Sequence, residues 1–230
     1  MPKFLFAFFL LFSIIYSCNP KLSNGLRKKD LQKDVEMVTD KGTLTIRLSD
    51  STPLHRDNFL SLVKKGYYDS MLFHRVLKNF MIQSGDPNSK HAKQSEQLGN
   101  GDPGYTIPAE FRSGLFHQKG VIAAARTGDD VNPTKASSGS QFYIVEGIKY
   151  SVETLEKVQK RAGREMPASQ KEVYINIGGT PWLDGAYTVF GETIKGLDVV
   201  DSIAFVSTDS NDRPIKDVRI LKARLVKRRK

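Results

Sequence analysis

FHRVLKNFMIQSGD, residues 73–86, is the stretch around which the rest of the chain can be interpreted. It combines a cation, two large apolar side chains and an amide, in Arg75, Phe80, Met81 and Gln83. Alternate side chains of an extended segment share a face. Arg75 and Gln83 are an even number of positions apart, so a strand, a bend and a second strand can place both beside one apolar patch. Such a surface suits a peptide rather than a metal ion or a phosphate.

The overall composition is that of a globular protein with a basic surface. The chain has 230 residues, of which 39% are hydrophobic, and a formal net charge of +10. This length suits one substantial core with short appendages. The basic residues are spread out and become dense only near the two ends, in residues 21–29 and 222–230. We therefore expect no nucleic-acid binding, and some attraction to anionic lipid headgroups.

The cysteine and histidine content argues against a disulfide and a metal site. The single cysteine, Cys18, has no partner for an internal disulfide. The four histidines are too scattered for a ligand motif, at His55, His74, His91 and His117. The chain also lacks a Gly-rich loop ending in Gly-Lys-Ser/Thr. We expect neither a metal ion nor a bound nucleotide.

The N-terminal residues resemble a bacterial lipoprotein signal. One cation, Lys3, precedes an apolar run over residues 4–16. A membrane-spanning helix needs about 20 residues, so this run fits the hydrophobic part of a secretory signal instead. The sequence IYSC at residues 15–18 then resembles a lipobox, with Cys18 as its cysteine.

This signal predicts how the chain is divided and where it is located. We expect residues 1–17 to be removed, Cys18 to be lipidated and residues 18–34 to form a flexible tether. Residues 35–230 then form the functional domain. It would be lipid-anchored to a membrane of the bacterial envelope, facing the periplasm or the cell surface. Simple secretion without lipid is the alternative.

The first half of the domain contains several strand signals and one helix. Two alternating segments, residues 35–39 and 43–48, flank Asp-Lys-Gly and predict a β-hairpin. Thr52 followed by Pro53 predicts the start of a helix that runs to about residue 65. Residues 86–105 are rich in Gly, Pro, Asn and Ser, and predict a long irregular loop of the functional kind.

The second half interrupts the strand pattern once. Strands are predicted at residues 120–126, 138–145, 187–190 and 217–226. Residues 151–163 have helical periodicity, a second helix is predicted over 167–177, and a short third one over 197–203. Many short strands with few helices predict a mainly β fold, a closed barrel capped by helices.

Three blocks, in this order, resemble the cyclophilin-type peptidyl-prolyl isomerases: residues 73–86, 138–145 and 182–191. The resemblance covers roughly residues 35–226. It implies a closed eight-stranded antiparallel β-barrel capped by two helices. Residues 151–178 are then a helical insertion relative to the compact members. The implied activity is cis/trans isomerisation of the peptide bond before proline, without a cofactor.

The resemblance also assigns roles to residues of this chain. Arg75 takes the position of the family's catalytic arginine. The residues that fall on the family's substrate-binding positions form the proline pocket, the backbone contacts, the groove and the rim: Phe80, Met81, Tyr143, Leu183, Gln83, Gln141, Ala125, Arg126, Thr127, Trp182 and Tyr187. Trp182 is associated in the family with cyclic peptide inhibitors of the cyclosporin kind. The expected partners are proline-containing polypeptides, and we expect a monomer.

The chain departs from the common family pattern at three of these positions and at Ser84. Tyr143 stands where many members have phenylalanine, which adds a hydroxyl to the pocket wall. Tyr187 stands for a frequent histidine, Arg126 for a common asparagine and Ser84 for a common glycine. Arg126 can alter the sequence preference.

Two other classes of function remain open from the sequence. A binding module or holdase would grip proline-containing segments with little turnover. A structural lipoprotein scaffold would carry its function in the insertion. The retained Arg75 argues for the enzyme.

Overall fold

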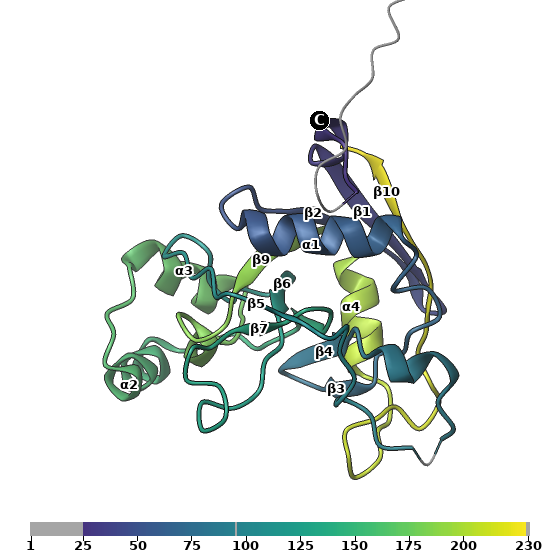
Figure 1. Ribbon diagram of the computed structural model, residues 1–230. Helices are drawn as coiled ribbons and strands as arrows, with labels where there is room; N and C mark the ends of the chain where they lie inside the picture. Colours follow the sequence, from purple (N-terminus) through teal and green to yellow (C-terminus); the bar gives the residue numbers. More distant parts are fainter. Residues whose placement is uncertain (1–24, 95, 229–230) are drawn as a thin grey trace, which may run out of the picture.

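The computed structural model describes residues 25–94 and 96–228, and a single sheet organises them (Figure 1). The eight strands of this sheet are antiparallel, in the order β10-β1-β2-β9-β6-β8-β4-β3. Their bounds are β1 Lys33–Thr39, β2 Gly42–Leu48, β3 Arg75–Leu77, β4 Met81–Ser84, β6 Val121–Ala124, β8 Phe142–Val145, β9 Val189–Lys195 and β10 Ile220–Lys227. A separate two-stranded ribbon joins β5 (Thr106–Ile107) to β7 (Ser137–Ser138).

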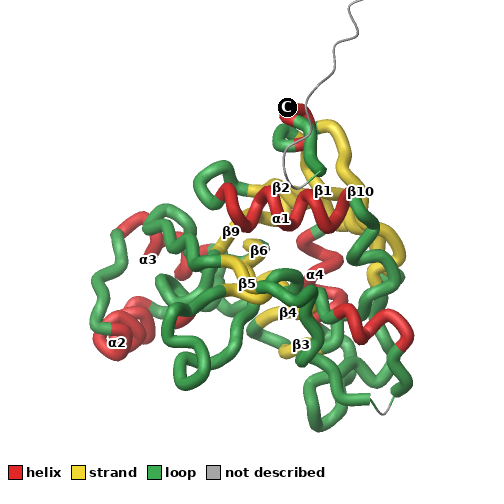
Figure 2. The backbone as a smooth tube through the Cα atoms, in the orientation of Figure 1, coloured by secondary structure: helices red, strands yellow, loops and turns green. Residues whose placement is uncertain are grey.

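Four α-helices accompany the sheet in the part of the chain that the structure describes. They are α1 Pro53–Lys64, α2 Val152–Ala162, α3 Ala168–Asn176 and α4 Leu197–Ala204. Three short 3-10 helices are also present, at Lys28–Asp30, Pro87–His91 and Pro181–Leu183. The predicted helices are therefore confirmed to within a few residues. Figure 2 shows that most of the chain between the Pro87–His91 turn and β6 is loop, as expected for residues 86–105.

The barrel is not closed, and the prediction of a closed eight-stranded barrel was wrong. The sheet is an open half-barrel whose edge strands, β3 and β10, share no ladder. The two edges meet through an isolated bridge between Leu72 and Arg219, a few neighbouring backbone hydrogen bonds, and side-chain contacts such as the ion pair of Asp69 with Lys222. The physical reason is the irregular chain before each edge strand. Ser70 has a left-handed φ of 70° within a run of turns, so the segment before β3 is not extended enough to pair in register.

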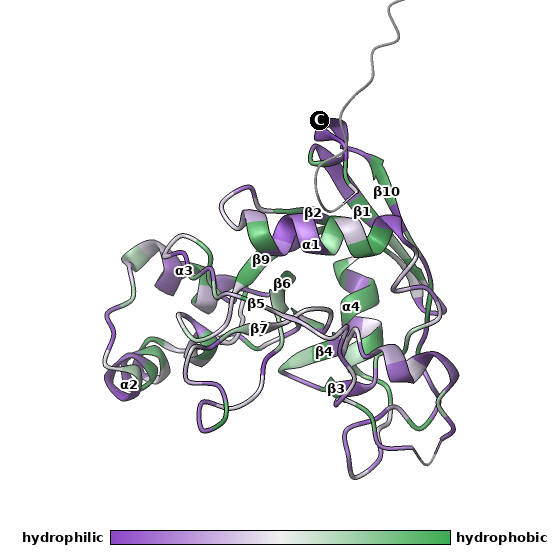
Figure 3. Ribbon diagram, viewed as in Figure 1, coloured by the Kyte–Doolittle hydropathy of each residue, from purple (hydrophilic) through white to green (hydrophobic). Residues whose placement is uncertain are grey.

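Two of the helices complete the main core. The apolar residues of α1 and α4 pack with those of the sheet in one cluster, which includes Phe59, Leu60, Val200, Ile203 and Phe142. Figure 3 shows that α4 and the strand β6 consist mostly of hydrophobic residues. Burial of these side chains is the main driving force for the half-barrel.

The start of α1 is stabilised by a residue that the local sequence does not indicate. Pro53 occupies the first turn, as predicted, but the Thr52 side chain makes no capping hydrogen bond. The backbone amides of Leu54 and His55 instead donate to the carboxylate of Glu110, at 3.2 and 3.0 Å. A distant carboxylate thus satisfies the free amides of the helix N-terminus.

The insertion folds as a small unit beside the sheet. α2 and α3 lie together on one side of the molecule, away from β1 and β10 (Figure 1). Ser151 caps α2 by accepting a hydrogen bond from the Thr154 amide, and Gly163 ends it with a left-handed φ of 59°. Tyr150, Leu155, Met166 and Tyr174 form a separate hydrophobic cluster there. The insertion therefore has a core of its own.

The described part of the expected tether packs against the domain. Leu26 is fully buried in the main core, and Asp30 forms a 2.7 Å ion pair with Lys64. β1 begins at Lys33, before the predicted domain start. The predicted signal peptide, Cys18 and the first part of the tether lie outside the described residues. Among residues 25–94 and 96–228, no helix combines the length and apolar character needed to cross a membrane.

Candidate functional site

The hairpin of β3 and β4 places the central polar pair. The loop between the strands turns at Asn79, whose φ of 66° is left-handed, a conformation that asparagine tolerates well. The resulting register sets Arg75 directly opposite Gln83. The Arg75 Nη1 donates to Gln83 Oε1 at 3.5 Å, a long hydrogen bond. The even spacing therefore predicted correctly that both side chains share a face.

A close approach between two backbones adds a second amide to this pair. Gly85 has a φ of 96°, and a Cβ at this position would lie 2.2 Å from the Ser140 carbonyl oxygen. The absence of a side chain lets β4 approach the segment before β8. Gln83 Nε2 then donates to Gln141 Oε1 at 3.1 Å. Gln141 Nε2 in turn donates to the carbonyl of Gly99, at 2.9 Å, so the network reaches the long loop.

Arg75 is also restrained from the opposite side. Its Nε lies 3.4 Å from a carboxylate oxygen of Asp212, which belongs to the turn before β10. The Arg75 side chain is 42% exposed, so its charge is solvated while the guanidinium remains in a defined place. A guanidinium stays protonated at any physiological pH. Arg75 can therefore donate hydrogen bonds to a bound ligand.

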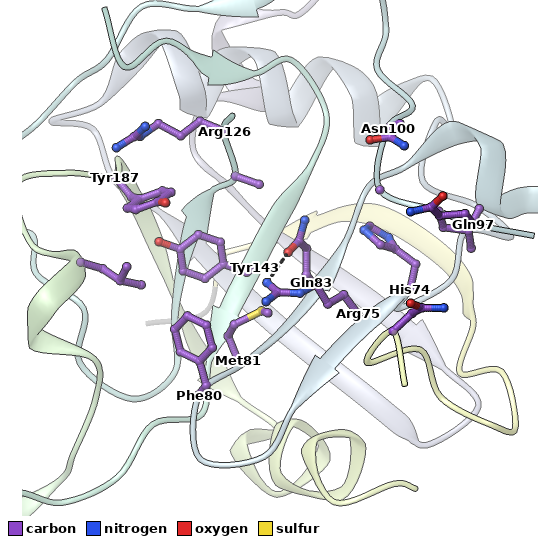
Figure 4. A pocket seen from close by; sticks show the side chains of 15 residues that line it. His74, Arg75, Phe80, Met81, Gln83, Gln97, Asn100, Arg126, Tyr143 and Tyr187 are labelled. Carbon is purple, nitrogen blue, oxygen red and sulfur yellow. Dashed lines mark hydrogen bonds between the residues drawn. The ribbon is translucent and has the colours of Figure 1, made fainter. Parts of the chain in front are cut away.

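A pocket of about 300 Å³ with one apolar wall lies next to Arg75 (Figure 4). Figure 4 shows Phe80, Met81 and Tyr143 on one side of Gln83 and Arg75, and His74 on the other. The sequence-predicted residues that line this pocket are Arg75, Phe80, Met81, Gln83, Ala125, Arg126, Tyr143, Leu183 and Tyr187. The structure thus brings nine of the predicted site residues to one cavity.

A second cavity of about 610 Å³ continues from the first. Gln83, Ala125 and Arg126 line both cavities. The two remaining groove residues, Thr127 and Gln141, line only the second. The two cavities form one continuous depression that an extended peptide can follow.

Arg126 is a fixed part of the wall between the cavities. Its Nε donates to the Ala186 carbonyl at 2.8 Å, and its Nη1 forms a 2.6 Å ion pair with Asp129. The guanidinium carbon lies 4.5 Å from the centre of the Tyr187 ring. The hydrogen bond and charge of Arg126 lower the pKa of Asp129. Arg126 therefore supports Tyr187 as well as bordering the groove.

Trp182 stands at the rim rather than in either cavity. Its ring centre is 5.8 Å from that of Phe80, and the residue is 46% exposed. It lies in the Pro181–Leu183 turn, next to Leu183 of the pocket. An exposed indole there can contact a ligand that extends beyond the pocket.

A buried polar network stands behind the pocket wall. The Tyr143 hydroxyl is 2.9 Å from His117 Nε2, and His117 Nδ1 is 2.9 Å from Asp184 Oδ1. Burial lowers the pKa of His117, more than the Asp184 carboxylate raises it. The imidazole is therefore neutral. Asp184 and Gly185 lie in a turn, and the Asp184 side chain also holds this network.

Other pocket residues were not selected from the sequence. His74 lines the pocket although it is only 4% exposed, and its burial lowers its pKa to about 4. The others are Gln97, Leu98, Gly99, Asn100 and Asn211. The composition of residues 86–105 did predict a functional loop. Asn211 lines the pocket and Asp212 pairs with Arg75 only because distant segments meet there, which the sequence pattern does not indicate.

The described residues contain no group of three or more His, Cys, Asp or Glu side chains placed to hold a metal ion. What they do provide is a fixed cation beside the apolar wall of a pocket, with two amides next to it. Such a site can bind an apolar ring and donate hydrogen bonds to a peptide backbone.

Comparison with known proteins agrees with this geometry. The family model described as cyclophilin-type peptidyl-prolyl cis-trans isomerase/CLD matches residues 34–225. A relative from Staphylococcus haemolyticus, named as a peptidyl-prolyl cis-trans isomerase, is 34% identical over 202 residues, or 87% of this chain and 94% of the relative. Peptidyl-prolyl cis-trans isomerase-like 1 of Neurospora crassa is 34% identical over 196 residues, or 84% and 94%.

Solved structures show the same fold. A crystal structure of a cyclophilin-type peptidyl-prolyl cis-trans isomerase from Cryptosporidium parvum matches with a TM-score of 0.61 at 22% identity, and the match covers 86% of this chain and 99% of that one. A structure of the same protein in the presence of the dipeptide Ala-Pro matches with a TM-score of 0.60 at 22% identity, covering 85% and 99%. On the family model and the sequence relatives, this chain belongs to the cyclophilin-type peptidyl-prolyl cis-trans isomerase family.

Proposed function

We propose that this chain accelerates the cis/trans isomerisation of X-Pro bonds in polypeptides, with Arg75 as its catalytic residue. The observation that carries the proposal is the position of Arg75 in a pocket whose apolar wall can hold a proline ring. Phe80, Met81, Tyr143 and Leu183 would contact that ring. The crystal structure of the Cryptosporidium parvum relative in the presence of Ala-Pro supports a ligand of this chemistry.

The physics of the reaction explains why a single cation suffices. Rotation about an amide bond is opposed by a barrier of about 18–20 kcal/mol because conjugation is lost. For an X-Pro bond the uncatalysed step takes tens to hundreds of seconds. The twisted amide has a pyramidal nitrogen whose lone pair can accept a hydrogen bond. A donor that binds this state better than either planar isomer lowers the barrier.

The surrounding residues would give the peptide its direction and place. Gln83 and Gln141 hold each other and the long loop, so they can bind a peptide backbone without reorganising. Ala125, Arg126 and Thr127 would line the path of the segment on one side of the proline. Their placement in one groove supports a polypeptide substrate rather than a small molecule.

A matched pair of phenylalanine variants tests the assignment of the pocket. The assay is protease-coupled isomerisation of a tetrapeptide with one X-Pro bond. We expect acceleration by the wild type, and a KM raised about tenfold in Phe80→Ala because the proline loses an apolar contact. Phe205→Ala is the control, because Phe205 is 57% exposed and lines neither cavity. It should leave the kinetics unchanged.

The same samples separate the isomerase from the other two classes. A holdase would suppress aggregation of an unfolded client without accelerating isomerisation. A scaffold would do neither. No acceleration by folded wild-type protein would contradict the proposed enzyme.

We also propose that the chain is a lipoprotein that assists protein folding in the bacterial envelope. The support is sequence alone: the apolar run before IYSC at residues 15–18, and the lone Cys18. Expression in bacteria with a labelled fatty acid tests it. Wild-type protein should carry the label and sediment with membranes, and Cys18→Ser should do neither. An unlabelled wild type would contradict lipidation.

Two further statements about partners belong to this proposal. We propose that the protein acts as a monomer, and that the exposed Trp182 offers a contact for cyclic peptides of the cyclosporin kind. Light scattering at micromolar concentration tests the first statement. Titration of the isomerase assay with such a peptide, in wild type and Trp182→Ala, tests the second.

A further inference from the structure

The insertion is connected to the pocket through the buried network behind Tyr143. Asp184 is 1% exposed at its side chain, and its two carboxylate oxygens serve different parts of the molecule. Oδ1 accepts from the His117 amide at 2.7 Å, and is 2.9 Å from His117 Nδ1. Oδ2 accepts from the Tyr174 hydroxyl at 2.8 Å and from Arg164 Nη2 at 3.0 Å. Tyr174 belongs to α3 and Arg164 to the α2–α3 connection, so half of the donors come from the insertion.

The protonation states determine which group donates and which accepts in each hydrogen bond of this network. Burial would raise the pKa of Asp184, but the hydrogen bonds from His117 and Tyr174 outweigh it, and the pKa lies below its usual value. The carboxylate is therefore charged, and the neutral His117 places its proton on Nδ1 to donate to it. His117 Nε2 is then an acceptor. Burial raises the pKa of Tyr143 well above its usual value, so the hydroxyl keeps its proton and donates to His117.

The consequence at the pocket is a fixed orientation of the Tyr143 ring. The His117 ring lies nearly parallel to it, with centres 6.0 Å apart and planes at 12°. Tyr187 contacts it edge-on, at 6.0 Å and 81°. Rotation of Tyr143 would leave its buried hydroxyl without a partner, which is energetically unfavourable. The hydrogen bond to His117 therefore opposes that rotation.

The chain returning from the insertion is built to reach this network. Gly179 has a φ of 150°, and a Cβ there would lie 2.1 Å from the His117 carbonyl oxygen. Because Gly179 has no side chain, the segment that returns from the insertion can lie directly against His117. The Thr180 amide donates to the same carbonyl at 2.8 Å. A few residues later in the chain, Asp184 places its carboxylate next to Nδ1 of the same imidazole. The approach is thus fixed by backbone as well as by side chains.

We propose that the insertion, residues 151–178, is a positioning element of the proline pocket. Tyr174 and Arg164 hold Asp184, and Asp184 holds Tyr143 through His117. The proposal rests on the proposed function, because Tyr143 matters here as a wall of the proline site. His117, Asp184, Arg164 and Tyr174 are positioning residues, since none of them touches the substrate.

A double-mutant cycle between the two ends of the network tests this coupling. Tyr174→Phe removes one hydroxyl and keeps the ring. We expect it to lower kcat/KM for an X-Pro tetrapeptide about three- to tenfold in the wild-type background, with the thermal midpoint measured alongside. In a Tyr143→Phe background the network has no hydroxyl to hold. There, Tyr174→Phe should change kcat/KM by less than about 1.5-fold.

Tyr150→Phe is the matched control. Tyr150 belongs to the same small cluster as Tyr174 and contacts its ring, but its buried hydroxyl has no hydrogen-bond partner among the residues that the structure describes. Removing that hydroxyl should leave kcat/KM unchanged. The proposal is overturned if Tyr174→Phe has no effect, if it has the same effect in both backgrounds, or if Tyr150→Phe acts as strongly.

A second readout keeps the proposal separate from the proposed function. The ¹⁵N shifts of the His117 imidazole report which nitrogen carries the proton, whether or not the protein is active. We expect a protonated Nδ1 in the wild type and a changed Nε2 shift in both Tyr143→Phe and Tyr174→Phe. If the wild type does not isomerise X-Pro bonds, the assay contradicts the proposed function, but the spectrum still tests the coupling. If the Nε2 shift is the same in Tyr174→Phe as in the wild type, the spectrum contradicts the coupling.

Discussion

Arg75 is held by groups from separate parts of the chain. Gln83 contacts it across the hairpin, and Asp212 contacts it from the turn before β10. The residue also lines a pocket in which a bound ligand would desolvate one side of the guanidinium. A cation fixed in this way can donate to a twisted amide with little loss of its own conformational freedom.

The ion pair with Asp212 should make a modest contribution to activity. Both side chains are about 40% exposed, and ion pairs of this kind are worth about 0–1 kcal/mol. We expect Asp212→Asn to lower kcat/KM about two- to fivefold, because Arg75 keeps only its long contact with Gln83. Kinetics at low and at high salt check this, since salt should reduce the wild type toward the variant. A loss above a hundredfold would instead place Asp212 in the chemistry.

At this scale the sequence indicated the pair of Arg75 and Gln83, but not the third member. Alternation along a strand relates residues that are close in sequence, and the register confirmed it. No local pattern relates Arg75 to Asp212 or Tyr143 to Asp184. Those contacts depend on how distant segments approach one another, which periodicity does not report.

Among the elements, the approach of β4 to the segment before β8 shapes the site. Gly85 makes it possible, and Ser140 completes it by donating its hydroxyl to the Gly85 carbonyl at 2.8 Å. Gln83 and Gln141 meet as a result. The predicted hairpin, helices and most strands agree with the structure because each has a local signal.

Gly85→Ala should be strongly destabilising. Its Cβ would lie 2.2 Å from the Ser140 carbonyl oxygen, and its φ is left-handed. We expect a loss of about 3 kcal/mol or more in the free energy of unfolding, measured in urea. Gly104→Ala is the control, because Gly104 has a similar φ of 88° with nothing within 4 Å of the added atom. It should cost only about 1–2 kcal/mol. Equal losses would contradict the steric account.

The open side of the half-barrel is the element-scale feature that the sequence did not predict. Strand patterns in the sequence indicate how many strands form, but not whether the two edge strands pair with each other. Here β3 has three residues and follows an irregular turn at Ser70, so it cannot form a ladder with β10. The strand pattern and the resemblance both predicted the closed form, but the irregular backbone before β3 prevents it.

At the scale of the whole molecule, buried neutral histidines make stability depend on pH. His74, beside the pocket, is the clearest case. Its pKa falls from 6.5 to about 4, mainly through burial, and the neighbouring cations Arg75 and Arg213 lower it further, while Asp86 opposes them. Between these two pH values the unfolded chain binds a proton that the folded chain does not. Stability therefore rises with pH across this window.

Acidification should consequently destabilise the wild type more than His74→Leu. Each unit of pKa shift corresponds to about 1.4 kcal/mol, so His74 alone should account for about 3 kcal/mol between pH 7 and pH 4. Urea unfolding at a series of pH values measures this. His55 and His117 contribute in both proteins and cancel in the difference. Parallel pH profiles of the two proteins would show that His74 is not the cause.

The central claim is that Arg75 accelerates rotation about the X-Pro bond. The most direct measurement is exchange NMR of the cis and trans forms of an X-Pro peptide, with catalytic amounts of wild type or Arg75→Ala. A charge-assisted hydrogen bond is worth about 1.5–3 kcal/mol, so we predict a loss of about 10- to 150-fold in kcat/KM. The circular dichroism spectrum and peptide affinity should stay close to those of the wild type. A folded Arg75→Ala that catalyses exchange as fast as the wild type would contradict the account.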